Sequence, residues 1–304
     1  MSESVFEPSG VIVLDKPGGV TSHDMVYALR RLYMIKRVGH AGTLDPLATG
    51  VLVMLVGRAA KAAEYIGADI KEYEATLLLG LSTDTQDVTG KALTESIDVP
   101  SEDEVLRAIE RFIGKSSQMP PMYSAKKVGG RKLVDIARRG GEVERSAQEI
   151  EIFSICANKI NEREYTLRVV CSAGTYIRTL CDDIGKALGC GACMKTLRRL
   201  RSGNFTLDRA YKIEELKAME ADVLVSALLP VDELFASFPS VTLEDFFSRL
   251  ASSGNEIYQK KIGTDYPIGE RVRMYDGDGF FALGEVREYE DGSAIKPIKL
   301  FRLD

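Results

Sequence analysis

The sequence predicts an α+β protein, and three observations support that fold class. Apolar runs typical of strands mix irregularly with segments of helical periodicity, and no steady strand–helix–strand repeat is present. Such a repeat would be typical of a parallel, doubly wound sheet. After Pro239, short apolar runs separated by Gly-Asp turns are typical of a small barrel-like β domain. We therefore expect a mixed domain over residues 1–234 and a small β domain over 235–304, with the boundary at about 232–238.

The N-terminal part of the chain contains a strand, a helix and a glycine-bounded loop. VIVLDKPGG at 11–19 predicts a buried strand and a turn, and TSHDMVYALRRLY at 21–33 predicts a capped amphipathic helix. The loop GHAGTLDPLATG at 39–50 precedes the apolar run VLVMLVG. Asp followed by Pro ahead of an apolar run is typical of a helix start, so the first interpretation of Asp45 is a helix cap.

The central part continues the mixture of strands and helices. KEYEATLLLG at 71–80 and EYTLRVVCS at 164–172 predict strands. SEDEVLRAIERFIG at 101–114 predicts a helix that runs from a capping box to Gly114. TYIRTLCDDIGKALG at 175–189 has helical spacing, and we expect the arginine-rich segment LRRLRSGNF after it to be helical as well.

Composition excludes several classes of protein. Of 304 residues, 45% are hydrophobic and 28% charged, which is ordinary for a soluble globular chain. No apolar run approaches the ~20 residues of a membrane span, and MSESVFEPSG is too polar for a signal peptide. We expect a cytoplasmic monomer. Its five cysteines, including the CGAC pair at 190–193, are expected to be reduced and to fill the core.

The net charge of −5 conceals two locally basic segments, at 124–145 and 163–212. Acidic residues concentrate elsewhere, in SEDE at 101–104, in EELKAMEAD at 214–222 and in the C-terminal part. A polyanion could therefore bind one side of the molecule through phosphate contacts. Solvated charged faces would explain the same distribution, and charge alone does not separate the two interpretations.

Common catalytic motifs are missing from the sequence. There are two histidines, and HExxH, GxSxG, paired CxxC and the Lys-Ser/Thr end of a phosphate-binding loop are absent. An alternative use of Asp45 is therefore considered. An ordinary Asp has a pKa of ~4, so it is ionised at neutral pH and can act as a nucleophile.

Two further residues suit this alternative. Arg178 could hold the carboxylate of Asp45 in place, and Tyr73 could stack on a base flipped out of folded RNA. Each residue also has a simpler explanation: Tyr73 as a strand aromatic, Arg178 as a surface cation and His40 as a turn residue.

The order of the motifs distinguishes these readings, because together they resemble the TruB-type tRNA pseudouridine synthases. The resemblance covers residues 10 to 210 and is highly specific, and the C-terminal part resembles a PUA domain more loosely. It is carried by LDKPGGVTS at 14–22, GHAGTLDPLATGVLVMLVGRAAK at 39–61, KEYEA at 71–75, PPMYSAKKVGGRKLVDIARRG at 120–140, CSAGTYIRTLCDDIGKALGCGA at 171–192 and LRRLRSGNF at 197–205.

The resemblance implies a role for individual residues. Asp45 matches the catalytic aspartate and Tyr73 the stacking tyrosine. Further matches are Tyr176, Arg178 and Leu197 in the uracil pocket, His40 as an RNA contact, and Lys16 and Pro17 as braces of the active-site loop. The segment at about 122–150 matches an inserted thumb that closes over RNA. Candidate contacts to the RNA backbone are Lys126, Lys127, Arg131 and Lys132 in the thumb, with Arg198 and Arg199 in the arginine-rich segment.

The resemblance also implies a fold and a reaction. The expected fold is a mixed, largely antiparallel sheet flanked by helices, with no metal or cofactor. The expected reaction converts the uridine at position 55, in the T loop of tRNA, to pseudouridine. Whether Asp45 attacks C6 of the base or C1′ of the sugar, or removes the C2′ proton, stays open.

Two other functions stay open beside this one. The first is a non-catalytic RNA-binding protein, which the Asp45, Tyr73 and Arg178 set disfavours. The second is the guide-RNA-dependent relative of the family, which the thumb-like insertion disfavours. The expected partner is therefore the T-stem loop of tRNA, without a guide RNA.

Overall fold

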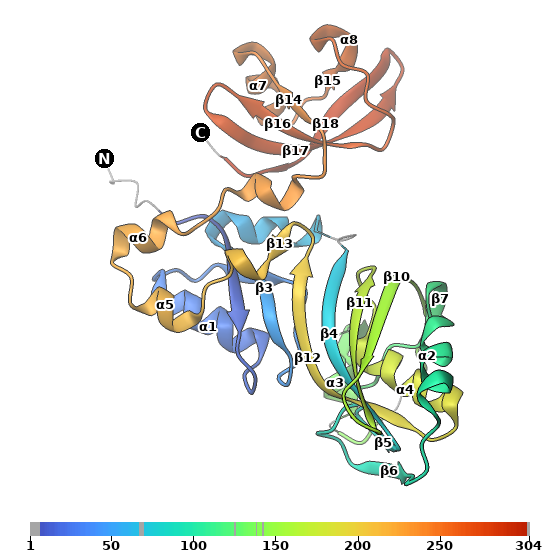
Figure 1. Cartoon of the computed structure of the whole chain (residues 1–304). Helices are drawn as coiled ribbons and strands as arrows, with labels where there is room; N and C mark the ends of the chain where they lie inside the picture. Colours follow the sequence, from blue (N-terminus) through green and yellow to red (C-terminus); the bar gives the residue numbers. More distant parts are fainter. Residues whose placement is uncertain (1–6, 67–69, 125, 138, 142, 303–304) are drawn as a thin grey trace.

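A large mixed sheet forms the centre of the molecule (Figure 1). The computed structural model describes residues 7–66, 70–124, 126–137, 139–141 and 143–302. Within them the sheet has the order β1-β3-β12-β4-β11-β10-β7, with β2 beside β3 and β13 beside β12. All of these pairs are antiparallel except β12 with β3, so the expected mixed, largely antiparallel sheet is confirmed. The strands are β1 (Gly10–Lys16), β2 (Val38–Ala41), β3 (Thr49–Val56), β4 (Lys71–Leu79), β7 (Gly114–Gln118), β10 (Gln148–Lys159), β11 (Glu164–Cys171), β12 (Ala192–Ser202) and β13 (Phe205–Thr206).

Helices cover one face of this sheet and enclose the main core. The buried stripes of α1 and α5 pack on β1 and β3, whereas those of α2 and α4 pack toward β4, β10 and β12. The capping box at Ser101 forms as expected, and the expected cap of α1 is a capping box at Thr21. Helical segments of this part are α1 (Ser22–Leu32), α2 (Glu102–Glu110), α4 (Ile177–Leu188), α5 (Ile213–Lys217), α6 (Ala221–Ser226), η1 (Gly57–Glu64), η2 (Leu207–Arg209) and η3 (Val231–Phe235).

Three local expectations are wrong. The run VLVMLVG forms strand β3 rather than a helix, because cores on both faces of the sheet bury it and give it a continuously apolar sequence. The arginine-rich segment is strand β12, so it cannot act as an arginine-rich helix. Helix α2 ends at Glu110, and Gly114 instead begins strand β7.

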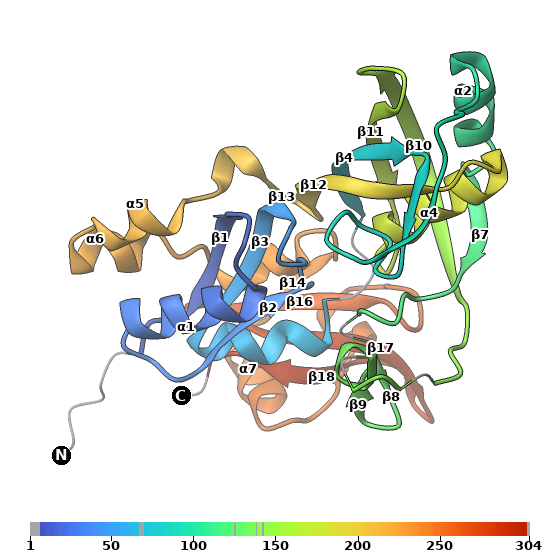
Figure 2. The same cartoon turned by 90° about the horizontal axis from the view of Figure 1, so that it is seen from below.

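A long insertion separates β7 from β10. We call residues 119–147 the thumb segment; the last three positions of the predicted thumb, 148–150, lie in strand β10. Figure 2 shows its hairpin β8–β9 well apart from the strands β7 and β10 that it connects. The thumb segment contains β8 (Lys127–Val128), β9 (Arg131–Lys132) and α3 (Leu133–Ala137). A second hairpin lies outside the thumb segment and consists of β5 (Leu81–Thr83) and β6 (Ala92–Glu95).

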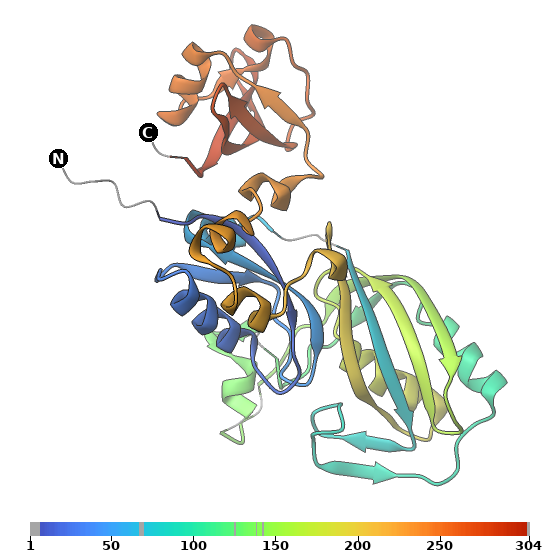
Figure 3. The same cartoon turned by 60° about the vertical axis from the view of Figure 1, so that its left-hand side comes forward.

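The C-terminal part forms a second sheet, β14-β16-β17-β18-β15, which we call the C-terminal sheet. In Figure 3 the segment around η3 lies between it and the large sheet. Phe235 is fully buried in a core shared by both sheets, with Val53 of β3 and Phe301 among its members. The elements are β14 (Ser240–Thr242), β15 (Ile257–Tyr258), β16 (Arg271–Asp276), β17 (Gly279–Tyr289), β18 (Gly292–Leu300), α7 (Asp245–Ser252) and α8 (Gln259–Ile262).

Two features of the sequence have simple places in the fold. Cys190 and Cys193 of the CGAC pair are buried and free, as expected of core cysteines. None of the helices in the described ranges is long and apolar enough to cross a membrane.

Candidate active site

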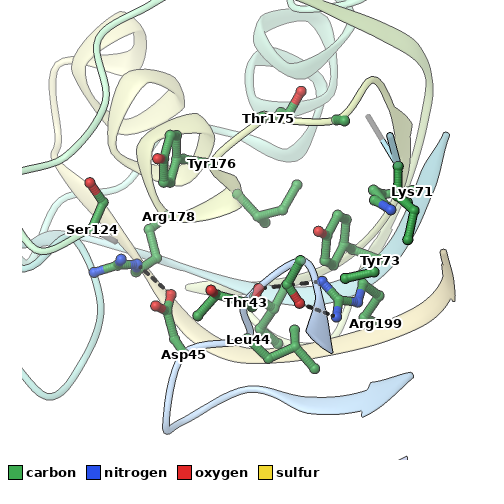
Figure 4. A pocket seen from close by; sticks show the side chains of 17 residues that line it. Thr43, Leu44, Asp45, Lys71, Tyr73, Ser124, Thr175, Tyr176, Arg178 and Arg199 are labelled. Atoms are coloured by element: carbon green, nitrogen blue, oxygen red, sulfur yellow. Dashed lines mark hydrogen bonds and ion pairs between the residues drawn. The ribbon is translucent and has the colours of Figure 1, made fainter. Parts of the chain in front are cut away.

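A cavity of about 310 Å³ opens where three parts of the large sheet meet. Its walls come from the loop after β2, from β4 and β12, and from the turn that leads into α4, and they are completed by Ile66 and by Ser124 of the thumb segment. Figure 4 shows Asp45 and Arg178 at one side and Tyr73, Lys71 and Arg199 at the other. The volume lies at the lower end of the range for small-molecule pockets, about 300–1,000 Å³.

Asp45 lies on the loop and forms an ion pair with Arg178. The distance from Arg178 Nε to Asp45 Oδ2 is 2.9 Å, and the side chain of Arg178 is 5% exposed whereas that of Asp45 is 34% exposed. The carboxylate is therefore held from one side and open on another. The alternative of a helix cap is wrong, because the segment after Asp45 leads into strand β3.

Arg178 connects Asp45 to two other loops. Its Nη1 donates to the carbonyl oxygen of Thr85 at 3.1 Å and lies 3.6 Å from Asp87 Oδ2. Its Nη2 donates to the carbonyl oxygen of Tyr123, at the base of the thumb segment, at 2.7 Å. A buried guanidinium with this many acceptors has little freedom to change rotamer, so Arg178 fixes the position of the Asp45 carboxylate.

The burial of this ion pair influences its protonation. Burial raises the pKa of the Asp45 carboxyl above its ordinary value, and the nearby Asp87 acts in the same direction. The Arg178 guanidinium opposes this rise and favours the ionised form.

Lys16 supports the loop from below. It is fully buried, and its Nζ donates to the carbonyl oxygens of Pro17 at 2.8 Å, Val20 at 2.7 Å and Pro46 at 3.4 Å. Burial lowers the pKa of its ammonium group to about 8, although the negative charge of Asp45 opposes this. The exposed Pro17 takes part through its carbonyl oxygen. The geometry suits the bracing role that the resemblance implies for Lys16 and Pro17.

The far wall of the cavity consists of Tyr73, Leu197 and Arg199. Tyr73 and Leu197 are 9% and 8% exposed. In the pairing of β4 with β12, Tyr73 lies opposite Arg199, and Leu197 lies opposite Ala75. Burial raises the pKa of the Tyr73 hydroxyl, and the adjacent Arg199 guanidinium partly offsets the rise. This wall offers one aromatic face and one aliphatic side chain to a planar ring.

The expected phosphate contact by Arg199 is wrong. Arg199 is 1% exposed, and its guanidinium donates to the carbonyl oxygens of Val51 at 2.7 Å, Gly42 at 3.1 Å and Thr43 at 3.4 Å. It therefore ties the active-site loop to strand β3. Arg198 points the other way and pairs with Asp15 at 2.9 Å.

The remaining candidate residues lie in the cavity wall, next to it on β2, or in the thumb segment. Tyr176 lines the cavity, whereas His40 lies on β2 one position before the lining residue Ala41 and is not itself part of the wall. In the thumb segment, Arg131 is exposed and Lys126 donates to Gln148 Oε1 at 2.9 Å. The side chains of Lys127 and Lys132 lie outside what the structure describes.

Several residues that support the site are not evident from the sequence. Ser22 Oγ accepts from the Leu44 N–H at 2.9 Å, and Gln118 pairs with both backbone groups of Tyr176. Asp87 accepts from the Thr89 N–H at 2.9 Å. The only sequence signal for these contacts is the polar turn DTQDVTG at 84–90, which is typical of a loop but does not show its neighbour.

Known proteins resemble the chain over nearly its full length. Two curated relatives are named tRNA pseudouridine synthase B. The relative from Alkaliphilus oremlandii is 41% identical over 97% of this chain and 98% of its own length. The relative from Geobacter sulfurreducens is 44% identical over 97% of this chain and 99% of its own length. A solved structure, described as a Cbf5-Nop10-Gar1 complex, has 28% identity and a TM-score of 0.75, covering 96% of this chain and 85% of the other.

Family assignment agrees with these similarities. Residues 30–177 match the N-terminal domain of the TruB family pseudouridylate synthases, and residues 178–236 match the C-terminal domain of tRNA pseudouridylate synthase B. The chain belongs to the TruB family of pseudouridylate synthases.

Proposed function

We propose that the protein converts the uridine at position 55, in the T loop of tRNA, to pseudouridine, with Asp45 as the catalytic residue. The observation that carries this proposal is the carboxyl group of Asp45, which Arg178 holds at 2.9 Å at one end of a cavity whose other end is lined by Tyr73 and Leu197. The curated relatives named for tRNA support the choice of substrate.

The cavity suits a base that has been flipped out of folded RNA. A uracil placed between Tyr73 and the Asp45 loop stacks on the aromatic ring, as bases commonly do in enzymes of this kind. The buried walls exclude water from the detached base. This arrangement retains the uracil while its orientation changes.

The reaction is an isomerisation and needs no other reactant. The bond from N1 of uracil to C1′ of ribose breaks, the base turns, and a bond from C5 to C1′ forms. The proton on C5 leaves to solvent and N1 gains one, so atoms and electrons balance. Attack at C6, attack at C1′ and removal of the C2′ proton all require an ionised Asp45, which Arg178 favours.

RNA binding is assigned to the basic faces around the cavity. The exposed Arg131 of the thumb segment, together with Lys126, would contact phosphates beside the cavity, and Arg198 would do so from strand β12. We place the C-terminal sheet, as a PUA-like domain, against another part of the same RNA. We further propose that the protein acts on tRNA without a guide RNA, and the 41–44% identity to relatives named for tRNA, against 28% to the Cbf5 complex, supports this choice. A cytoplasmic location and a monomeric state complete the proposal.

Release of tritium from a T-arm transcript labelled at C5 of uridine tests the proposal, because the C5–H bond breaks only in the isomerisation. We expect wild-type protein to release tritium and Asp45→Asn to bind the transcript but release none. Asp84→Asn is a matched control, since Asp84 is an exposed carboxylate that accepts from the Lys91 N–H and does not line the cavity. Binding without release by the wild type would support the non-catalytic RNA-binding alternative.

A further inference from the structure

Tyr65, which directly follows η1, is held by the C-terminal sheet. Its hydroxyl donates to the carbonyl oxygen of Ile298 at 3.1 Å, and its own carbonyl oxygen accepts from Arg271 Nη1 at 3.1 Å. The guanidinium of Arg271 lies 5.8 Å and the ammonium of Lys299 5.6 Å from the centroid of the Tyr65 ring. Both cations are close enough for a cation–π interaction, so residues of β16 and β18 fix both the ring and the backbone of Tyr65.

The next residue in the chain, Ile66, lines the active-site cavity. Ile66 also packs against the core that the two sheets share, which includes Leu283 of the C-terminal sheet and Phe301 just after it. One peptide bond therefore joins a residue clamped by the C-terminal sheet to the wall of the cavity that contains Asp45.

Attachment of the C-terminal sheet does not require this clamp. Phe235 is fully buried, and its ring centroid lies 5.7 Å from that of Phe301 and 6.2 Å from that of Phe280. These contacts hold the two sheets together on the side of η3. The polar and cationic contacts to Tyr65 add a second connection, and this one reaches the catalytic cavity.

We propose that the C-terminal sheet positions a wall of the active site, with Tyr65 and Arg271 as positioning residues that act through Ile66. This inference rests on the proposed function of the cavity. In that reaction the detached uracil has to be kept in place and dry while it turns, so a displaced apolar wall slows the chemical step rather than the capture of RNA.

The test uses the full-length protein with the labelled T-arm transcript. We expect Arg271→Met to slow the single-turnover rate of tritium release by about tenfold, the order expected when a reacting group is held slightly out of alignment. Its Kd for the transcript should stay unchanged. Tyr65→Phe keeps the ring between the two cations and should slow release less than Tyr65→Leu. The control is Lys296→Met, because Lys296 lies on the same strand as Lys299 but pairs with Glu256 within the C-terminal part.

A double-mutant cycle separates a positioning role from a general loss of stability. If Arg271 acts through Ile66, Arg271→Met slows Ile66→Ala much less than it slows the wild type, whereas independent effects on the rate would multiply. Should Arg271→Met fail to fold, the same cycle with Tyr65→Leu decides.

The possible outcomes distinguish the inference from the function on which it rests. The inference is overturned if the Arg271 and Tyr65 variants release tritium at the wild-type rate, or if their effects multiply with that of Ile66→Ala. In either case, an inactive Asp45→Asn leaves the proposed function standing. No tritium release by the wild type removes the proposed function itself, and full turnover by Asp45→Asn removes Asp45 as its catalytic residue. A weaker Kd with an unchanged rate would show that the clamp serves RNA binding instead, and this also overturns the inference.

Discussion

The active-site loop and the thumb segment border the same cavity, but they are held in different ways. The loop, residues 42–46, is bound from below by the buried Lys16, Ser22 and Arg199, and Asp45 itself is held by Arg178. Among the described residues of the thumb segment, the carbonyl oxygen of Tyr123 accepts from Arg178, Lys126 donates to Gln148, and further hydrogen bonds join residues of the segment to one another. Buried cations bound to carbonyl oxygens hold the loop in place, whereas the thumb segment places the basic side chain of Arg131 at the surface.

This difference indicates a division of tasks. Groups that react need fixed positions before substrate arrives, and groups that contact a flexible polyanion do not. Changes in the loop and its supports should therefore alter the chemical step, whereas changes in the thumb segment should alter RNA affinity.

The largest expected effect follows from Arg178→Met. The variant lacks the guanidinium that orients the Asp45 carboxylate and favours its ionised form. Turnover should therefore fall on the order of a hundred- to a thousandfold, as it does when other fixed electrostatic groups are removed from active sites. Arg178 lowers the pKa of Asp45, so residual activity should require a higher pH than in the wild type. Tritium release as a function of pH measures both effects.

A matched control for this variant is Arg163→Met. Arg163 also donates to backbone carbonyl oxygens, those of Leu79 and Gly80, but it does not line the cavity. Equal losses of turnover in the two variants would mean that the effect comes from the fold and not from Asp45.

The next effect concerns stability and compares Arg199 with its neighbour Arg198. Arg199→Met leaves three carbonyl oxygens around the loop without their charged donor and should lower the free energy of unfolding by about 3 kcal/mol. Arg198→Met removes a partly exposed ion pair with Asp15 and should cost less than about 1 kcal/mol. Urea denaturation of both variants measures the difference. Similar free energies of unfolding in the two variants would contradict a structural role of the buried Arg199.

These two arginines also show what the sequence can and cannot predict. In a helix both side chains would be available at the surface, and the expected arginine-rich helix therefore made both into phosphate contacts. In strand β12 successive side chains point to opposite faces, which puts Arg199 into the cavity wall and Arg198 outside. The motif therefore identifies the right segment, but the roles of Arg198 and Arg199 depend on whether that segment is a helix or a strand.

Local patterns predicted many elements but not their long-range contacts. Capped helices with one apolar face, such as α1, follow from nearby residues. The fully apolar β3 does not reveal its conformation, because a strand buried on both faces and a buried helix have similar sequences. The pairing of Asp45 with Arg178 follows from the chemistry of the two side chains and agrees with the resemblance. The contacts of Arg178 with Thr85 and Tyr123 cannot be predicted, because they involve backbone oxygens, which leave no mark in the sequence.

A moderate effect is expected in the thumb segment. Replacing Lys126 and Arg131 with Ala removes two candidate phosphate contacts and should weaken RNA binding about tenfold at low salt. The slope of log K against log salt should become shallower by about 0.9 for each contact that is lost. The single-turnover rate at saturating RNA should not change, since neither residue lines the cavity.

Titration of binding at several salt concentrations, together with tritium release, tests this prediction. The control is Lys186→Ala, because Lys186 is an exposed cation on α4 paired with Asp182 and lies outside the thumb segment. A slower chemical step at saturating RNA in the thumb variant would remove the proposed division between the two regions.

The smallest effect concerns the stability of Asp45→Asn. Folding raises the pKa of Asp45, so the folded protein disfavours its ionised form relative to the unfolded chain. The stabilising contribution of the protonated form is complete below the unfolded pKa and is lost as the pH rises through the folded pKa. Asn stays neutral at every pH, so the variant should be more stable than the wild type at neutral pH and equally stable in acid.

The gain should be less than about 1 kcal/mol, because the carboxylate is 34% exposed and paired. Urea denaturation across this pH range measures the difference. A variant less stable than the wild type at neutral pH would show that attraction to Arg178 outweighs burial, and the loop would then be held by its catalytic charge as well as by Lys16, Ser22 and Arg199.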